Sequence, residues 1–196
     1  MKRTLWVLLL LLGGWVQAQT SYQVSSQSSM FIDGTSTIHD WTATVGQVSG
    51  TFQLDDAFAK KNGPKAGAVV SGGRLQVVVS SIDGGKGATM NDKIVAAFQA
   101  ERHPHIVFTL KQARVLPGGT GQAFDLRAEG DLAMAGQTHP LGLDLKGKRL
   151  ADGTYEFTGR HAMKMTTYGM TPPTALFGQI ETGDEIVIRF TLHLKP

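Results

Sequence analysis

Along most of the chain, hydrophobic and polar residues alternate one by one, the spacing of a β-strand with one buried face. The stretch from Phe124 to Met134 shows this most clearly, with Leu126 and Leu132 on the apolar side and charged residues between them. Other stretches repeat the pattern, and Gly, Pro, Asn or Asp separates most of them. They are Tyr22–Ile32, Thr37–Val45, Val48–Leu54, Gly73–Ser80, His105–Lys111, His139–Gly147, Thr154–Met165 and Glu185–Leu194. The alternation predicts about eight or nine strands.

One segment, Asn91–Glu101, lacks alternation and predicts a helix. It is rich in Ala and opens with residues that favour helix N-termini, and Ile94 and Phe98 fall on one face. We expect two to three turns that end before Pro104. The region Thr171–Thr182 is expected to be a loop with a short helical turn.

Strands with one solvent-exposed face and one buried face require two packed sheets or a closed barrel. The strand count and the single helix favour an all-β fold with one short α-helix, a single antiparallel β-barrel of about eight strands. Such a barrel is filled by side chains or holds one small ligand. The small inward residues Gly50, Ala128, Gly130 and Gly159 either leave space for a ligand or mark bulges and corners of the sheet.

The N-terminal segment predicts export. Lys2 and Arg3 precede an apolar run from Leu5, and small residues ending in Ala18 form a cleavage site. The run is shorter than the ~20 apolar residues that cross a bilayer. We therefore expect residues 1–18 to be a removed signal peptide. Residues 19–196 would form one domain that is periplasmic or secreted and does not span the membrane.

Composition excludes several classes of function. The chain has no Cys, which rules out disulfides, thiol catalysis and thiolate metal sites. Loss of Lys2 and Arg3 lowers the formal net charge of +3 by two, so the mature chain has no electrostatic basis for binding nucleic acid.

We find no catalytic or metal-binding constellation. His103 and His105 flank Pro104, and no carboxylate lies at ligand spacing near them. The chain lacks a Gly-x-Ser-x-Gly or Ser-x-x-Lys motif, and the glycines of Asp83–Gly87 lack the Lys-Ser/Thr order of a phosphate loop. We predict a protein without metal, cofactor or enzyme activity. An enzyme that uses its histidines is the weaker rival.

Three motifs, in order along the chain, carry a family resemblance. The first runs from Met90-Asn91-Asp92-Lys93-Ile94 through Phe98 and Glu101 to His103-Pro104 and Ile106-Val107-Phe108. The second is the hairpin Glu129–Leu141, and the third joins Tyr168–Pro172 to Asp184–Ile188. Together they resemble the YceI-like family over Tyr22–Leu194. Thr35–Trp41 departs from the opening strand of members with isoprenoid pockets, which indicates a divergent branch.

The resemblance implies an extended lipocalin-like barrel with a helix against it, commonly periplasmic, and a pocket for polyisoprenoid or fatty-chain ligands. We therefore predict a binding protein for a long-chain lipid, isoprenoid or quinone-like amphiphile. The alternative is a ligand-free structural or stress-linked interaction module with a filled barrel. Ligand identity and oligomeric state, a homodimer included, stay open.

The expected apolar lining combines the inward phase of the strands, on which His161 lies, with Trp41 and with Phe98 of the predicted helix. Trp41 either lines the barrel mouth or packs in the core, and His161 is the polar exception, where a ligand headgroup could supply its partner. The predicted lining residues are Trp41, Phe52, Val77, Val79, Phe98, Phe108, Phe124, Leu126, Leu132, Met134, Phe157, His161, Met163, Ile188 and Phe190.

Overall fold

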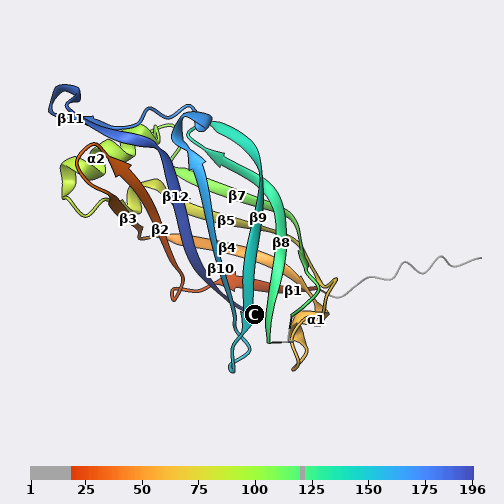
Figure 1. The fold of residues 1–196 in the computed structure, drawn as a ribbon. Coiled ribbons are helices and arrows are strands. Elements are labelled where there is room, and N and C mark those ends of the chain that lie inside the picture. The colour runs from red at the N-terminus through yellow and green to blue at the C-terminus, as the bar shows by residue number, and fades with distance from the viewer. Residues whose placement is uncertain (1–18, 120–121) are drawn as a thin grey trace, which may run out of the picture.

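A computed structural model describes residues 19–119 and 122–196 (Figure 1). The predicted signal peptide, residues 1–18, lies outside the described residues. The strands are β1 (Gln19–Val24), β2 (Ser29–Ser36), β3 (Trp41–Val45), β4 (Val48–Asp55), β5 (Val69–Val78), β6 (Ile82–Asp83), β7 (His105–Val115), β8 (Ala123–Met134), β9 (Gln137–Arg149), β10 (Tyr155–Lys164), β11 (Thr174–Ala175) and β12 (Ile180–Lys195). The helices are α1 (Asp56–Ala59) and α2 (Ala88–Ala97).

The strands close into an antiparallel barrel in the order β1-β4-β5-β7-β8-β9-β10-β12. Closure comes from β1, which pairs with β4 on one side and with the end of β12 on the other, where Gln23 lies opposite Lys195. Past this seam, β2, β3 and β6 extend the sheet beside the rest of β12, so the barrel flares toward α2 (Figure 1). The predicted eight-stranded barrel is confirmed.

The stretch Tyr22–Ile32, expected as one strand, forms two. β1 and β2 both pair antiparallel with β12, and a turn at residues 25–28 separates them. The backbone of His193 holds this turn in place. Its carbonyl accepts a hydrogen bond from Ser25 N at 2.8 Å, and the N–H of His193 donates to Ser28 Oγ at 3.0 Å. Within the turn, Ser28 N donates to the carbonyl of Ser25 at 3.0 Å, which interrupts the ladder although the apolar alternation continues.

Side-chain hydrogen bonds also move other strand boundaries. The strand expected over Thr37–Val45 begins at Trp41, because Ser36 Oγ accepts from the backbone N–H of His39 at 3.2 Å in a turn. The strand expected over Gly73–Ser80 is β5, which starts at Val69. It ends at Val78, where a 3₁₀ turn of residues 79–81 begins.

The expected loop Thr171–Thr182 contains β11, a 3₁₀ turn of residues 176–178 and the start of β12, which is longer than predicted.

The helix starts three residues earlier and ends four residues earlier than predicted, over Ala88–Ala97 instead of Asn91–Glu101. Asn91 does not cap it. Its Oδ1 accepts from Gly84 N at 2.9 Å and its amide donates to Asp83 at 3.2 Å, so it fastens the preceding loop instead. The helix ends before Pro104 as expected. The four-residue α1 was not predicted; Asp55 caps it by accepting from Ala57 N at 2.8 Å.

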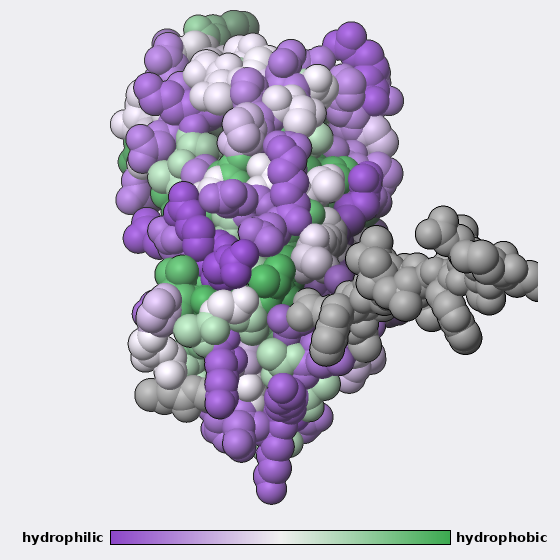
Figure 2. All heavy atoms as spheres, turned by 90° about the vertical axis from the view of Figure 1, so that its right-hand side faces the viewer, coloured by the Kyte–Doolittle hydropathy of each residue, from purple (hydrophilic) through white to green (hydrophobic). Residues whose placement is uncertain are grey.

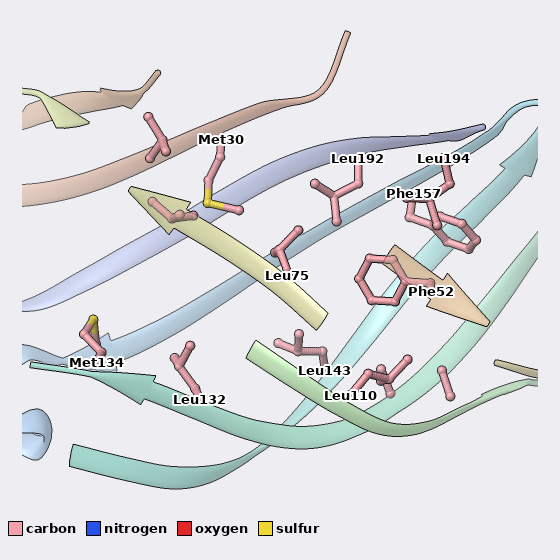
Figure 3. Close-up of a cluster of buried hydrophobic side chains, with 14 of the residues drawn as sticks. Met30, Phe52, Leu75, Leu110, Leu132, Met134, Leu143, Phe157, Leu192 and Leu194 are labelled. Carbon is pink, nitrogen blue, oxygen red and sulfur yellow. The ribbon is translucent and has the colours of Figure 1, made fainter. Parts of the chain in front are cut away.

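Alternation along the strands separates core from surface. The even-numbered residues of β8 are buried and the odd-numbered ones are exposed or half-buried. Figure 3 shows side chains from opposite walls, including Met30, Leu75 and Leu143, directed into a common interior. The face in Figure 2 is mostly hydrophilic, with hydrophobic atoms visible chiefly in a band across its middle.

Candidate functional site: two chambers in the barrel

The body of the barrel encloses an inner chamber of about 130 Å³. Of the described residues that line it, every one except His161 is apolar. An apolar cavity of this size stays dry and accepts a hydrocarbon. The lining residues are Met30, Ile32, Val45, Phe52, Val70, Leu75, Val77, Ile106, Phe108, Leu110, Ala113, Leu126, Ala128, Leu132, Leu141, Leu143, Leu145, Phe157, His161, Ile188, Phe190, Leu192 and Leu194.

A second, outer chamber of about 210 Å³ lies under α2, in the flared end. Its walls come from β2, β3, α2, the segment after β10 and the start of β12. Ile32 lines both chambers, so the two are adjacent. The exposed residues Ile38, His39, Lys86 and Thr174 contribute to its lining, so the outer chamber reaches solvent.

The opposite end of the barrel is sealed by aromatic rings. Phe58 of α1 and Tyr155 are fully buried, with ring centroids 5.3 Å apart in an edge-on contact, and Phe124 packs against both. The Tyr155 hydroxyl donates to the carbonyl of Phe58 at 2.5 Å. Burial raises the pKa of Tyr155 to about 12, partly offset by the nearby charge of Arg149. The phenol therefore stays neutral and keeps its donor.

The inward glycines leave no open space, and Gly130 also lies where the register between β7 and β8 shifts, after Leu110. A Cβ on Gly73 would lie 2.2 Å from the Phe52 ring, one on Gly159 would lie 2.5 Å from the Phe190 ring, and one on Gly130 would lie 2.7 Å from the Phe108 ring. The rings of Phe52, Phe190 and Phe108 therefore occupy the space beside these glycines. At Gly50 and Gly130 the atom nearest to an added Cβ would be a backbone carbonyl oxygen at 2.4 Å, that of Arg74 and of Thr109 respectively.

The predicted lining residues separate into three groups. Phe52, Val77, Phe108, Leu126, Leu132, Phe157, His161, Ile188 and Phe190 line the inner chamber. Trp41 and Phe98 line the outer chamber. Val79, Phe124, Met134 and Met163 are buried but line neither.

Physical reasons explain two of these exceptions. Val79 lies in the 3₁₀ turn after β5, and Phe124 belongs to the aromatic seal.

Trp41 combines the two roles considered for it. Its ring lies over Gly34, where a Cβ would approach within 2.2 Å, and its indole N–H donates to the Thr35 carbonyl at 3.0 Å. It also lines the outer chamber. The residue is packed and forms part of the cavity wall.

Sequence reasoning missed the leucines of β9. Leu141, Leu143 and Leu145 line the inner chamber, and their one-residue alternation was visible in the sequence. It also missed the outer chamber, whose wall includes Met170, Pro173 and Ile180 from segments without periodicity.

The wall is less tightly closed between β9 and β10. Their ladder runs from Arg149 opposite Tyr155 to Leu145 opposite Gly159 and stops there. Farther along, Tyr168, from the 3₁₀ turn after β10, makes an edge-on contact with His139 of β9, with ring centroids 4.9 Å apart.

His161 lies on β10, two residues beyond Gly159, where the pairing with β9 ends, and opposite Ile188 of β12; it lines the inner chamber. No side chain in the described part of the chain hydrogen-bonds to its imidazole. Burial lowers its pKa, since the apolar surroundings disfavour the imidazolium.

Among the described residues, no group of three or more His, Asp or Glu side chains converges as a metal site would require. In the same part of the chain, neither helix has the length and apolar character needed to cross a bilayer.

Solved structures share this fold. BcnA of Burkholderia cenocepacia is 19% identical, with a TM-score of 0.67 over 87% of this chain and 98% of BcnA. A polyisoprenoid binding domain of Saccharophagus degradans, described as implicated in plant cell wall breakdown, is 12% identical, with a TM-score of 0.64 over 91% and 99% of the two chains. The Campylobacter jejuni YceI protein is 15% identical, with a TM-score of 0.57 over 79% and 84%.

No curated protein matches the chain. The YceI-like domain model, in contrast, matches residues 22–194, and this span includes all three motifs and the lining of both chambers. The chain belongs to the YceI-like domain family.

Proposed function

We propose that this protein is an exported carrier that holds a long-chain lipid or isoprenoid in its barrel, without catalysing a reaction. The observation that carries the proposal is the inner chamber, lined by apolar side chains with His161 as the exception. Such a lining favours a hydrocarbon tail, because burial of apolar surface drives binding at ~25 cal/mol per Å² before ordering costs.

The proposed arrangement places the tail in the inner chamber and the polar end toward the outer chamber. The sealed end carries three packed aromatic rings, whereas the outer chamber reaches solvent. The similar fold of the polyisoprenoid binding domain supports an isoprenoid or similar chain as ligand. The N-terminal segment, with its charged start and small residues before Ala18, supports export to the periplasm or medium.

The alternative is a ligand-free module. It is favoured by the phenyl rings beside the inward glycines, because these rings fill space that a ligand would otherwise occupy. Mass spectrometry of gently purified protein separates the two. A co-purified lipid supports the carrier, and repeated spectra of the empty chain support the filled barrel.

A cavity-filling variant tests the site itself. Ala128 is 1% exposed and lines the inner chamber, so Ala128→Leu adds apolar bulk where the tail would lie. We expect the affinity for a fluorescent fatty-acid or isoprenoid probe to fall by at least about tenfold, a loss of ~1.4 kcal/mol.

The matched control is Ala133→Leu, on the outward phase of the same strand. It should bind the probe as the unchanged protein does. Equal affinity in Ala128→Leu and Ala133→Leu would place the tail outside this barrel.

A further inference from the structure

Large apolar side chains gather on the surface at the open end of the barrel. In the described part of the chain, four large hydrophobic residues are exposed. Three of them, Ile38, Leu176 and Phe177, lie beside the outer chamber; Ile38 and Leu176 are 62% and 63% exposed, and Phe177 is fully exposed. The fourth, Leu116, is 36% exposed and follows β7 at the sealed end.

Hydrogen bonds join the segments that carry these residues. Leu176 and Phe177 form the tip of the β11–β12 hairpin, in which Ala175 lies opposite Ile180. Lys93 of α2 donates to the carbonyl of Thr174 at 2.8 Å, and Thr37 N donates to the carbonyl of Glu181 at 3.0 Å. The three apolar side chains therefore belong to one braced rim, which projects beyond the barrel with β11 (Figure 1).

The backbone at the hairpin tip is strained. Leu176 and Phe177 have φ values of 49° and 54°, a left-handed conformation that disfavours residues with a Cβ. Gly178 follows with φ of 87°, as glycine tolerates. Two bulky apolar residues thus adopt an unfavourable backbone conformation, and no burial of their side chains offsets its cost. This combination indicates a functional contact.

We propose that this rim, Ile38 with Leu176 and Phe177, inserts into the surface of an anionic lipid bilayer and so brings the mouth of the outer chamber to the membrane. The shape of the rim favours this occupant. The side chains lie on a hairpin tip and a loop, and such projections enter a deformable lipid surface more readily than they form a flat interface with a second copy.

The charges at the chamber mouth match this surface. The ionisable residues that line the outer chamber are Lys86, Lys93 and His39, with no carboxylate among them. Asp40 and Glu181 are exposed carboxylates close in sequence to the rim residues, so apolar insertion carries most of the contact. The lysines add attraction to lipid phosphates near the opening.

The test is sedimentation of the purified chain with vesicles of phosphatidylcholine and phosphatidylglycerol. The double variant Leu176→Gly with Phe177→Gly removes both side chains and also relieves the left-handed strain. We expect at least a tenfold loss of vesicle binding with an unchanged or higher melting temperature. A merely structural role for the two residues predicts a lower melting temperature.

Two further variants complete the experiment. Leu116→Ser removes the exposed leucine at the sealed end and should leave vesicle binding unchanged. Phe177→Trp should preserve binding, and the emission of the introduced indole should shift to shorter wavelength on vesicles.

Unchanged sedimentation of the double-glycine variant overturns the proposal, as does a chain that fails to bind vesicles. A dimer that the same variant dissociates also overturns it, because the occupant is then a second copy. Vesicle binding is measured without a fluorescent probe in the barrel. Its outcome is therefore independent of the probe titration of Ala128→Leu, which tests the proposed carrier function.

Discussion

Tyr155 shows how a single buried polar atom fixes the sealed end of the barrel. Its hydroxyl donates to Phe58 of α1, far away in the sequence, and neither residue is exposed. Tyr155→Phe leaves the carbonyl without its donor in an apolar site. We expect the free energy of unfolding to fall by about 1–3 kcal/mol, as measured by urea denaturation.

Tyr22 provides the control for this variant. It is 3% exposed and packs edge-on against Tyr155 at 5.9 Å, and within the described residues its hydroxyl has no hydrogen-bond partner. Tyr22→Phe should change stability little. If both variants lose the same amount, the hydrogen bond to Phe58 is not what stabilises the seal.

His161 makes stability depend on pH. Burial lowers the pKa of its folded-state imidazole below the unfolded value of 6.5, so the unfolded chain binds more protons in this range. Its contribution is therefore complete above about pH 6.5 and is lost as the pH falls through the folded-state pKa. We expect the melting temperature to fall between pH 7.5 and 5.

Two variants isolate the imidazole. His161→Gln should weaken this pH dependence, whereas His105→Gln, at an exposed position on β7, should leave it unchanged. Parallel pH profiles for His161→Gln and the unchanged protein would contradict the assignment.

At the scale of elements, contacts between a glycine and a neighbouring ring hold the flared part of the sheet. Gly34 on β2 lies opposite Trp41 on β3, and a Cβ there would come within 2.2 Å of the indole. Gly34→Ala must displace the ring and weaken its hydrogen bond to Thr35. We expect a loss of about 1–3 kcal/mol and a changed emission of Trp41.

The comparison is Gly72→Ala on β5, where the nearest atom to the new Cβ is a carbonyl oxygen 3.8 Å away. That variant should be tolerated. Unchanged Trp41 emission in Gly34→Ala would mean that the ring is not held against β2.

The elements themselves were largely predictable from the sequence because a half-buried strand shows its period of two in every residue. Their ends were not, because they depend on single polar side chains. Ser28 and Ser36 interrupt strands by bonding the backbone, and Asn91 fastens a loop although it resembles a helix cap. Each of these side chains accepts a hydrogen bond from a backbone N–H group, and the hydrophobic pattern does not show which N–H groups need such a partner.

At the scale of the whole molecule, the two chambers differ in how far the sequence revealed them. The inner chamber follows from the inward phase of the strands, and Phe52, Leu126 and Ile188 on that phase line it. The outer chamber was hidden because its wall joins α2 to irregular segments far along the chain, such as the one that carries Met170. Loop positions have no periodicity, and only the closed barrel brings them together.

Barrel closure also bears on where the mature chain begins. The predicted cleavage after Ala18 makes Gln19 the first residue, and Gln19 is the first residue of β1, opposite Asp55 of β4. A cut beyond Tyr22 would remove a core residue and most of the strand that pairs with both β4 and β12. Processing at Ala18 is therefore compatible with a closed barrel, whereas processing beyond Tyr22 is not.

We expect N-terminal sequencing of the protein from the exported fraction to begin at Gln19. A chain expressed directly from Gln19 should match its melting temperature. A chain that starts at Val24 should unfold at a markedly lower one, because the seam between β4 and β12 then lacks its strand. Recovery of Met1 from the exported fraction would contradict the cleavage. Equal stability of the chain from Val24 would show that β1 is not what closes the barrel.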